Sequence, residues 1–500
     1  MHSNQVIIIG SGIAGMAAAV RLACAGYQVS VYEKNAYPGG KLSVFEKDGY
    51  RFDAGPSLFT QPVNIEDLFE TAGEPIADYF SYSAVDTACR YFFENGKTID
   101  AFTDAELFSQ ELSEKTGEDP AAVKKYLKES EKLYNNIGSI FLQHSLHKKN
   151  TWFNKRVIRA LGSVRFPYLF STLNKYNVKK FRSPESIQIF NRYATYNGSN
   201  PFKAPGMLSL IPHLEQNQGT FYPKGGMISI TNALYHLALK KGVTFHFNQA
   251  VERIIHHEGK AHGIVVDGKN IHANIIVSNG DIYFTYKNLL HHPVKAKKIL
   301  KQERSSSAVI FYWGIGKSFP GLGLHNILFS SSYKEEFDNL FTKGLPGTDP
   351  TVYINITSKM EEGHAPVGKE NWFVMVNAPA NSGQDWEKLK STIRQRVIEK
   401  INRILQIDLE PLIETEEVLD PVLIEERTGS YMGSLYGTSS NTRFAAFLRP
   451  ANFTSYIKGL YFCGGSVHPG GGIPLCFNSA KITASLIGKD FKNRDTHLEK

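Results

Sequence analysis

Short apolar runs alternate with amphipathic stretches in the first part of the chain, and this pattern predicts a βαβ unit. Residues 6–9, with the sequence Val-Ile-Ile-Ile, form a continuous run of β-branched side chains, which is typical of a parallel strand buried on both faces. Helical spacing follows as far as Leu22, Gly26 ends the helix, and residues 29–32 form a second strand. The chain therefore begins with strand, helix and strand in the order of a nucleotide-binding fold.

Three glycines between the first strand and the helix support this interpretation, because Gly10, Gly12 and Gly15 have the spacing G-x-G-x-x-G. Gly10 allows a tight turn, Gly12 lets backbone N–H groups approach a pyrophosphate, and Gly15 lets helix and strand pack closely. The helix N-terminus then stabilises the phosphate charge. Glu33 follows the second strand, where a carboxylate can accept hydrogen bonds from both ribose hydroxyls. Since a carboxylate would repel a 2′-phosphate, we expect FAD or NAD and not NADP.

The rest of the chain does not continue as a plain βαβ series. Helices are predicted at 97–134, 224–238, 386–405 and 482–487. Strands are predicted at 243–247, 250–255, 261–266, 273–279, 307–315, 325–329, 351–356, 372–378 and 459–465. Because the last buried strand returns so late, the nucleotide fold must be interrupted. We expect an α/β protein with two discontinuous domains: a Rossmann-type nucleotide-binding domain (1–85, 222–290 and 455–500) and a mixed-sheet and helical substrate domain (86–221 and 291–454).

Composition narrows the class of protein only slightly. Among the 500 residues, 42% are hydrophobic and 21% are charged, as in ordinary globular chains. No stretch is apolar enough to cross a bilayer, and residues 6–25 lack the basic flank of a signal peptide and include Arg21. We therefore expect the protein in the cytoplasm.

Neither cysteines nor histidines predict a metal site. The cysteines have no metal-binding spacing, and we expect free buried thiols in a reducing compartment. They are Cys24, Cys89, Cys463 and Cys476. The adjacent pairs His256-His257 and His291-His292 point in different directions on any regular element, so we expect surface histidines and no metal.

Motifs along nearly the whole chain resemble those of the FAD-dependent carotenoid (phytoene-type) desaturases, within the wider amine oxidase-like flavoproteins. The matching motifs are the glycine loop, EK at 33–34, GGK at 39–41, FDAGPS at 52–57, YPKGGM at 222–227, VSN at 277–279, HPGGGIP at 468–474 and SAK at 479–481. The second glycine pair, Gly39-Gly40, is a feature of FAD proteins of this class, so the resemblance favours FAD over NAD.

The resemblance also implies a role for several of these segments. The pyrophosphate would lie on the loop and helix start, the adenosine ribose at Glu33 with Lys34 at its edge, and the adenine at backbone groups of Val251. The loop and helix start comprise Gly10, Gly12, Ile13, Ala14 and Gly15. The ribityl chain and flavin would lie along Gly40, Lys41, Gly55, Pro56 and Ser57. The other side of the pyrophosphate would contact Gly465 and Ser466, and the flavin ring would lie near Gly472, Ile473 and Pro474. Many flavoproteins of this class have Asp or Glu where this chain has Ser466, so we expect a weaker or water-bridged contact there.

The reaction that the resemblance implies is the removal of two hydrogens from adjacent carbons of a polyene. Hydride would pass from an allylic C–H to flavin N5, the polyene would spread the positive charge, and a neighbouring proton would leave, so that the protein mainly positions the reactants. His468 is the titratable side chain within the C-terminal flavin motif and therefore the candidate for proton removal. The alternative is a structural histidine bonded to the backbone.

The C-terminal sequence SVHPGGGIPL at 466–475 is more similar to the hydroxycarotenoid 3,4-desaturase branch than to phytoene desaturases. We therefore expect a 1′-hydroxycarotenoid (1′-hydroxy-γ-carotene type) as the substrate and a 3′,4′-didehydro product. The alternatives are a multi-step phytoene desaturase, a flavin-dependent carotenoid isomerase, and a prenyl-lipid escort protein that uses no flavin. The intact glycine loop, Glu33 and Gly39-Gly40 argue against the escort protein.

A basic segment at 148–182 is the candidate surface for binding to a membrane. No Asp or Glu occurs between Lys132 and Pro184, and aromatic and aliphatic side chains are interleaved with the cations. The cations are Lys148, Lys149, Lys155, Arg156, Arg159, Arg165, Lys175, Lys179, Lys180 and Arg182. Because a carotenoid must be extracted from a membrane, we expect peripheral binding to the inner face of the cell membrane. Nucleic acid is not expected, because no nucleic-acid fold accompanies the patch. The alternative is a solvated basic face over core aromatics.

Overall fold

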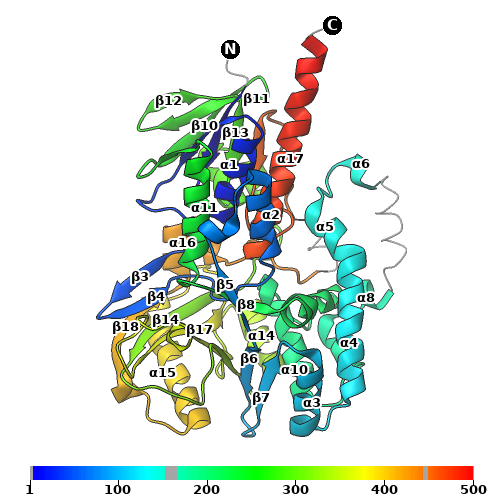
Figure 1. Ribbon diagram of the computed structural model, residues 1–500, viewed down its shortest axis with the longest axis vertical. Coiled ribbons are helices and arrows are strands. Elements are labelled where there is room, and N and C mark those ends of the chain that lie inside the picture. Colours follow the sequence, from blue (N-terminus) through cyan, green and yellow to red (C-terminus); the bar gives the residue numbers. More distant parts are fainter. Residues whose placement is uncertain (1–3, 153–165, 443–448, 499–500) are drawn as a thin grey trace.

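The computed structural model describes residues 4–152, 166–442 and 449–498. Two groups of strands and helices follow one another along the long axis, and both chain termini lie at the same end (Figure 1). The upper group in that view contains the first and last elements of the sequence, and the lower group contains mainly the middle elements.

The upper group is built on a five-stranded parallel sheet of order β19-β13-β1-β2-β9. Its strands are β1 (Gln5–Ile9), β2 (Gln28–Tyr32), β9 (Thr244–His246), β13 (Ile275–Ser278) and β19 (Leu460–Phe462). The helices α1 (Ile13–Cys24), α2 (Val63–Ala72), α11 (Ile228–Lys240) and α17 (Ile473–Leu498) share its apolar core. The predicted nucleotide-binding topology is confirmed, including the late return of the chain at β13 and β19.

Smaller sheets flank this one. An antiparallel three-stranded sheet contains β10 (Val251–His257), β11 (Lys260–Val266) and β12 (Lys269–His272). Two antiparallel pairs complete the strands: the hairpin of β3 (Val44–Lys47) and β4 (Tyr50–Asp53), and the pair of β5 (Tyr82–Val85) and β8 (Thr220–Pro223), which are far apart in sequence.

The lower group is built on a seven-stranded mixed sheet of order β18-β14-β17-β16-β15-β6-β7. Its strands are β6 (Thr87–Phe92), β7 (Thr98–Phe102), β14 (Ser307–Ile315), β15 (His325–Leu328), β16 (Val352–Ile356), β17 (Glu370–Ala378) and β18 (Ile413–Leu419). One face packs on α15 (Trp386–Leu405), and the other packs on α3 (Ala105–Thr116), α4 (Pro120–Leu133) and α10 (Pro184–Arg192). Only the β15–β6 pair is parallel among the strand pairs described in this sheet.

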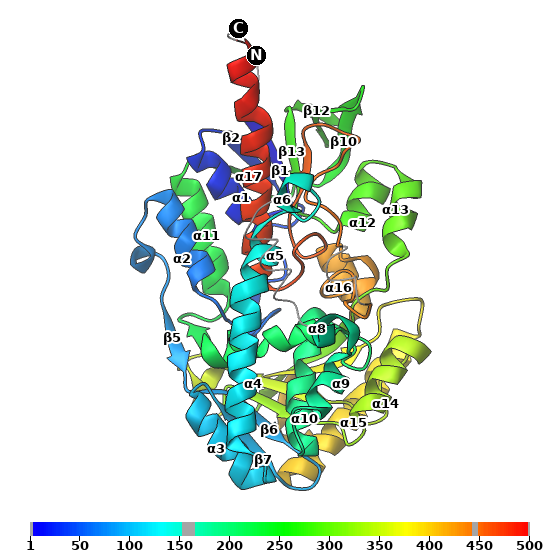
Figure 2. The same cartoon turned by 90° about the vertical axis from the view of Figure 1, so that its right-hand side faces the viewer.

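Short helices connect these layers. They are α5 (Ser139–Gln143), α6 (Lys149–Trp152), α8 (Phe166–Phe170), α9 (Leu173–Val178), α12 (Ile282–Phe284), α13 (Pro293–Leu300), α14 (Tyr333–Asp338) and α16 (Pro421–Thr428). Figure 2 shows α4 and α17 along the long axis of the molecule, with α5 packed against α17 between them.

The helix predicted at 97–134 is wrong at its start, because β7 occupies Thr98–Phe102. In this strand Ile99 and Ala101 are buried and alternate with less buried neighbours, and β7 pairs antiparallel with β6. The short period-two alternation was hidden beside the longer helical run that begins at Ala105. The remaining stretch is two helices, α3 and α4, each capped by an aspartate side chain.

Predictions on cysteines, histidines and membrane helices have mixed outcomes. All four cysteines are free, and Cys89 and Cys463 are buried, as predicted. Cys476 is only partly buried, and Cys24 is exposed at the end of α1, so the expectation of a buried thiol was wrong for Cys24. His256, His257, His291 and His292 are exposed, as predicted. In the part of the chain that the structure describes, no helix is both long enough and apolar enough to cross a membrane.

Candidate functional site

The glycine loop lies between β1 and α1 and is held by backbone contacts to both neighbours. Gly10 N–H donates to the carbonyl of Tyr32 at 2.8 Å, and Gly39 N–H donates to the carbonyl of Ser11 at 2.9 Å. A Cβ at Gly15 would lie 2.3 Å from the Gly10 carbonyl oxygen, so only glycine permits this packing. Ile13 and Ala14, at the buried start of α1, place the helix N-terminus at the loop.

Asn279 is a residue of this loop environment to which the sequence analysis gave no role. It follows β13, and its side-chain amide lies against Gly12, where a Cβ would be 2.7 Å from Nδ2. The thiol of Cys463 donates to its Oδ1 at 3.7 Å. The VSN motif at 277–279 could have indicated that Asn279 lies beside the glycine loop. The reason is that β13 and β1 are parallel neighbours, so that their carboxyl ends meet at one edge of the sheet.

Glu33 lies at the end of β2 and is buried, with a relative exposure of 5%. Its Oε2 accepts hydrogen bonds from Ser11 N–H and Ser11 Oγ, both at 2.8 Å, and its Oε1 accepts from the backbone and side-chain nitrogens of Asn35. The Lys34 ammonium donates to the carbonyl of Glu426 at 2.9 Å. Val251 begins β10, two residues after Gln249, whose N–H donates to the Glu33 carbonyl. The structure thus brings the three residues assigned to the adenosine side to one sheet edge.

The second predicted segment, Gly40 to Ser57, folds over the glycine loop. A Cβ at Gly40 would lie 3.6 Å from Gly12 Cα, and one at Gly55 would collide with the Lys41 carbonyl at 1.8 Å. Pro56 and Ser57 follow in the same turn.

Two side chains of this segment reach other elements. The Lys41 ammonium donates to the Leu435 carbonyl at 3.1 Å, and the hydroxyls of Ser57 and Tyr353 lie 2.8 Å apart. Burial lowers the pKa of Lys41, an effect that the charge of Asp281 opposes. Both residues therefore connect the glycine loop to parts of the chain far away in sequence.

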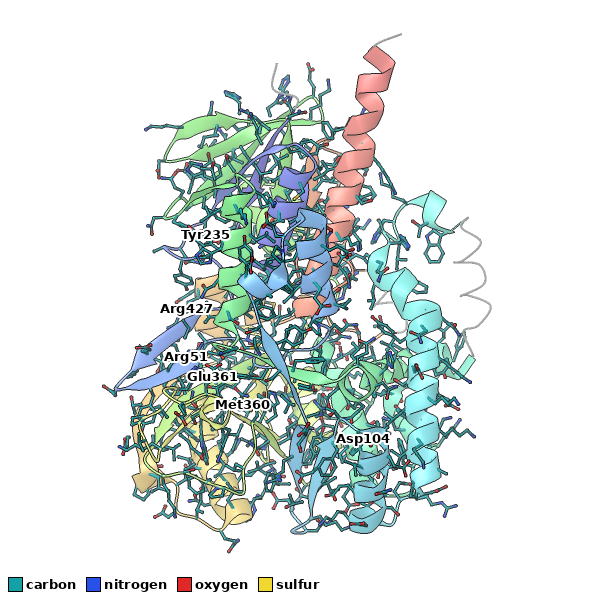
Figure 3. All side chains as sticks on the ribbon, viewed as in Figure 1. Arg51, Asp104, Tyr235, Met360, Glu361 and Arg427 are labelled. Atoms are coloured by element: carbon teal, nitrogen blue, oxygen red, sulfur yellow. The ribbon has the colours of Figure 1, made fainter. Side chains whose placement is uncertain are left out.

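Asp53, within the FDAGPS motif, holds the turn that precedes α11. Arg51 Nη2 donates to Asp53 Oδ1 at 2.9 Å and to the Gly225 carbonyl at 3.0 Å, while Asp53 Oδ2 accepts from Met227 N–H at 3.1 Å. Glu361 accepts from Gly225 N–H on the other side, and Figure 3 labels Arg51 and Glu361 near the junction of the upper and lower groups. The FDAGPS and YPKGGM motifs are therefore joined by the hydrogen bond between Met227 and Asp53, and Arg51 contacts both motifs.

The C-terminal motif supplies the other half of the predicted site. Gly465 and Ser466 follow β19, and Ser466 Oγ accepts a hydrogen bond from Ile282 N–H at 2.9 Å. Gly472 has a φ of +110°, and no heavy atom would lie within 4 Å of a Cβ placed there. Ile473 and Pro474 begin α17, so a second helix N-terminus lies at this segment.

His468 is 2% exposed and bonded to the backbone. Its Nε2 lies 2.9 Å from the carbonyl oxygen of His144, and because that oxygen can only accept, Nε2 carries the proton. Burial lowers the pKa of His468 to about 4. The ring is therefore neutral at pH 7 and a weak base, which fits the structural alternative better than proton removal.

These residues fit a bound flavin dinucleotide. Gly12 and Gly40 leave backbone without side chains on one side, Gly472 leaves open space on the other, and two helix N-termini provide donors for an anion. Among the described residues no group of three or more His, Cys, Asp or Glu could hold a metal ion.

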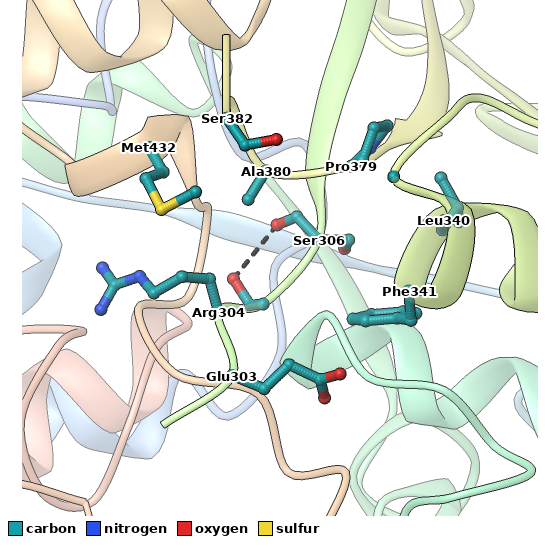
Figure 4. A pocket seen from close by; sticks show the side chains of 11 residues that line it. Glu303, Arg304, Ser306, Leu340, Phe341, Pro379, Ala380, Ser382 and Met432 are labelled. Carbon is teal, nitrogen blue, oxygen red and sulfur yellow. Dashed lines mark hydrogen bonds between the residues drawn. The ribbon is translucent and has the colours of Figure 1, made fainter. Parts of the chain in front are cut away.

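A separate cavity of about 190 Å³ lies at the start of β14 and the end of β17. Figure 4 shows Arg304, Phe341, Pro379 and Met432 around it, with Glu303 nearby. It is smaller than the roughly 300 Å³ at which small-molecule sites begin. This cavity alone does not hold a flavin or a long polyene.

Comparisons with known proteins agree with this geometry. Residues 13–488 match the family model of flavin containing amine oxidoreductases. The chain is 51% identical over 484 residues to a 1-hydroxycarotenoid 3,4-desaturase of Flavobacterium sp. (strain P99-3), with 97% of this chain and 99% of that protein covered. It is 32% identical to a phytoene desaturase of Fusarium fujikuroi, with 98% and 90% covered. A solved structure of a putrescine oxidase variant has a TM-score of 0.63 at 13% identity, with 97% and 99% covered, and shows the shared fold.

Proposed function

Since the chain belongs to the flavin containing amine oxidoreductase family, we propose that it is an FAD-dependent carotenoid desaturase acting on a 1-hydroxycarotenoid. The protein is an FAD oxidoreductase, as the sequence predicted. The proposed reaction introduces a 3′,4′ double bond into the hydroxylated acyclic end of a carotenoid of the 1′-hydroxy-γ-carotene type.

One observation carries the choice of substrate. The identity to the 1-hydroxycarotenoid 3,4-desaturase is 51%, against 32% to the phytoene desaturase, with nearly full coverage in both cases. Multi-step phytoene desaturation is therefore the second candidate. An isomerase without net oxidation and a flavin-free escort protein, the other two alternatives, are not favoured, because the chain is an FAD oxidoreductase.

The residues of the site have distinct proposed tasks. The glycine loop with Ile13 and Ala14 would bind the pyrophosphate, Glu33 the ribose and Val251 the adenine, while the 40–41, 55–57, 465–466 and 472–474 segments would enclose the ribityl chain and flavin. Bound FAD supplies the two-electron acceptor for the hydrogens that leave the substrate. The chain itself excludes water and orients the polyene, and His468, neutral and bonded to His144, keeps the turn before α17 in place.

The domain assignment is part of the proposal. The nucleotide-binding domain would comprise 1–85, 222–290 and 455–500, and the substrate domain 86–221 and 291–454. The separate five-stranded and seven-stranded sheets support this division.

We further propose that the basic segment docks on the cytoplasmic face of an anionic membrane. Lys155, Arg156, Arg159 and Arg165 lie outside the described residues. In the described part, Lys175, Lys179 and Arg182 are exposed, and Phe170 and Val178 nearby are 46% and 52% exposed. Cations beside exposed apolar side chains suit a lipid surface.

The function is tested with purified FAD-loaded protein and two liposome-borne substrates, phytoene and 1′-hydroxy-γ-carotene. Absorbance and product mass are followed together. Loss of two hydrogens with a red shift from the hydroxylated substrate alone supports the proposal. Conversion of phytoene instead would favour the second candidate, and isomerisation without mass change would favour the third.

A further inference from the structure

A row of polar side chains lies on one face of the seven-stranded sheet, beside the turn at 55–57. The register places Tyr91 of β6 opposite Ile327 of β15, and Ile327 opposite Tyr353 of β16. His325 precedes Ile327 by two residues and therefore points to the same face. Tyr91 and Ile327 belong to the apolar core that α3, α4 and α10 share on this side, with Tyr353 packed against it.

Hydrogen bonds connect this row to the predicted flavin segment. The Tyr353 hydroxyl lies 2.8 Å from Ser57 Oγ and 2.8 Å from His325 Nδ1. Ser57 belongs to the turn that we assign to the ribityl chain and flavin. A continuous polar path thus leads from that turn to the His325 ring.

The hydrogen-bond pattern assigns the His325 tautomer. Asn355 Nδ2 lies 3.1 Å from His325 Nδ1 and 3.0 Å from the Leu324 carbonyl. Because an amide nitrogen only donates, Nδ1 is an acceptor and Nε2 carries the proton.

The Nε2–H of His325 is a donor without a protein partner. The residue is 3% exposed, and no hydrogen-bond partner of Nε2 is found among the described residues. Leaving a donor buried and unpaired is unfavourable by about 1–3 kcal/mol. Such a group in the interior calls for a ligand or another explanation.

The electrostatic setting makes this donor neutral. Burial lowers the pKa of His325 to about 4, and the charge of Arg192 lowers it further while Glu215 acts in the opposite sense. Arg192 and Glu215 form a buried ion pair at 2.7 Å and cancel most of each other's field. A neutral N–H suits an uncharged oxygen, whereas a carboxylate or phosphate ligand would be matched by a cation.

A second buried group on the same face can complete the recognition of an alcohol. The Tyr91 hydroxyl is fully buried and has no hydrogen-bond partner among the described residues. An alcohol both accepts and donates one hydrogen bond, and the histidine N–H and the phenol oxygen supply the complementary pair. A hydrocarbon chain end would leave both groups unpaired.

We propose that His325 binds the terminal hydroxyl group of the carotenoid substrate through Nε2–H, with Tyr91 Oη as acceptor, and thereby selects hydroxylated over unhydroxylated chain ends. This inference rests on the proposed function and identifies the residues that recognise the hydroxyl group of its substrate. In a 3,4-dehydrogenation, the carbon that bears a 1-hydroxyl is separated from the reacting carbons by a single carbon. The hydroxyl must therefore bind close to the flavin, which is where the path from Ser57 through Tyr353 leads.

The test compares a hydroxylated carotenoid with the same carotenoid lacking the hydroxyl, in the FAD-loaded wild-type protein and in His325→Leu. The ratio of kcat/KM for the two substrates is measured, together with FAD content. In His325→Leu this ratio is expected to fall by about 10- to 100-fold, the effect of losing one buried hydrogen bond. His325→Gln keeps an N–H close to the Nε2 position and is therefore expected to retain most of the discrimination between the two substrates. This variant keeps the test informative if His325→Leu folds poorly.

His364→Leu is the matched control, because His364 is also buried but both its ring nitrogens have partners, Thr357 and Glu361. Its substrate ratio should equal that of the wild type. An unchanged ratio in both His325 variants, or a wild-type protein that converts both substrates equally well, would overturn the assignment of His325. If the wild type converts neither carotenoid, the proposed function itself fails, and the inference fails with it.

Discussion

The side-chain amide of Asn279 lies directly against Gly12, so that a Cβ added at Gly12 would be 2.7 Å from Asn279 Nδ2. The two residues follow the neighbouring parallel strands β1 and β13, and Asn279 fills the space from which a side chain at Gly12 is excluded. The glycine thus serves the packing of the loop as well as the approach of a phosphate.

Gly12→Ala is expected to reduce the FAD content of the purified protein at least tenfold, since the added methyl must displace Asn279 and with it the loop. FAD released on denaturation, measured by absorbance per mole of protein, checks this. The matched control is Gly488→Ala in α17, where no atom lies within 4 Å of the added methyl. This control should raise stability by about 0.5–1 kcal/mol without changing FAD content. Full FAD content in Gly12→Ala would contradict the packing argument.

Glu215→Gln is expected to destabilise the protein by about 3–5 kcal/mol, because it leaves the Arg192 charge buried without its counter-ion. The side chains of Arg192 and Glu215 are 9% and 1% exposed, and the hydroxyl of Tyr193 also donates to Glu215 at 2.9 Å. Chemical denaturation measures the change. Asp338→Asn in the exposed Lys334–Asp338 pair is the control and should change the midpoint little. Equal effects of both substitutions would show that burial of the pair is unimportant.

Acidification is expected to destabilise the protein through two buried histidines. Burial lowers the pKa of both His325 and His468 from 6.5 to about 4. Between these pH values the unfolded chain binds more protons than the folded one, so stability is lost as the pH falls from 6.5 towards 4.

The measurement is the melting temperature at pH 7.5 and pH 5 for the wild type and for His325→Gln with His468→Gln. The double variant should show a smaller drop between the two pH values, although its melting temperature at pH 7.5 is lower. His272→Gln, which changes an exposed histidine, should leave the drop unaltered. An equal drop in all three proteins would rule out these two histidines as its source.

Local patterns predicted the nucleotide-binding half well, because its central strands β1, β13 and β19 are almost entirely buried and its turns need glycine. β1, β2, β13 and β19 all lie where continuous apolar runs indicated them. The strand at Thr98–Phe102 was missed because a short alternating segment beside a long helical one gives a weak signal. Its identity depends on pairing with β6, which is a tertiary contact.

The polar partners within the site could not be predicted in the same way. The sequence placed Ser57 in the turn of the FDAGPS motif, but its contact with Tyr353 joins residues far apart in the chain. The same holds for the Ser466 hydroxyl, which accepts from Ile282 N–H. Motif spacing reports backbone geometry, whereas such side-chain pairs depend on how the two sheets meet.

Reversing the charges of Lys175, Lys179 and Arg182 to Glu is expected to weaken binding to vesicles that contain anionic lipid. Each cation near such a surface contributes about 1 kcal/mol, so three reversals should lower the partition coefficient at least 100-fold at low salt. Added salt should weaken wild-type binding in the same direction. Sedimentation with vesicles of phosphatidylglycerol and phosphatidylcholine measures both effects.

The matched control reverses Arg253, Lys260 and Lys269, three exposed cations of the β10–β12 sheet at the other end of the molecule. Because both triple variants change the net charge equally, a general electrostatic attraction would weaken binding equally in the two proteins. A loss confined to the Lys175, Lys179 and Arg182 variant would locate the docking surface at α9 and the segment after it. Equal or unchanged binding would leave the basic segment as a solvated face over the aromatic core, and a route other than this surface would be needed for entry of the carotenoid.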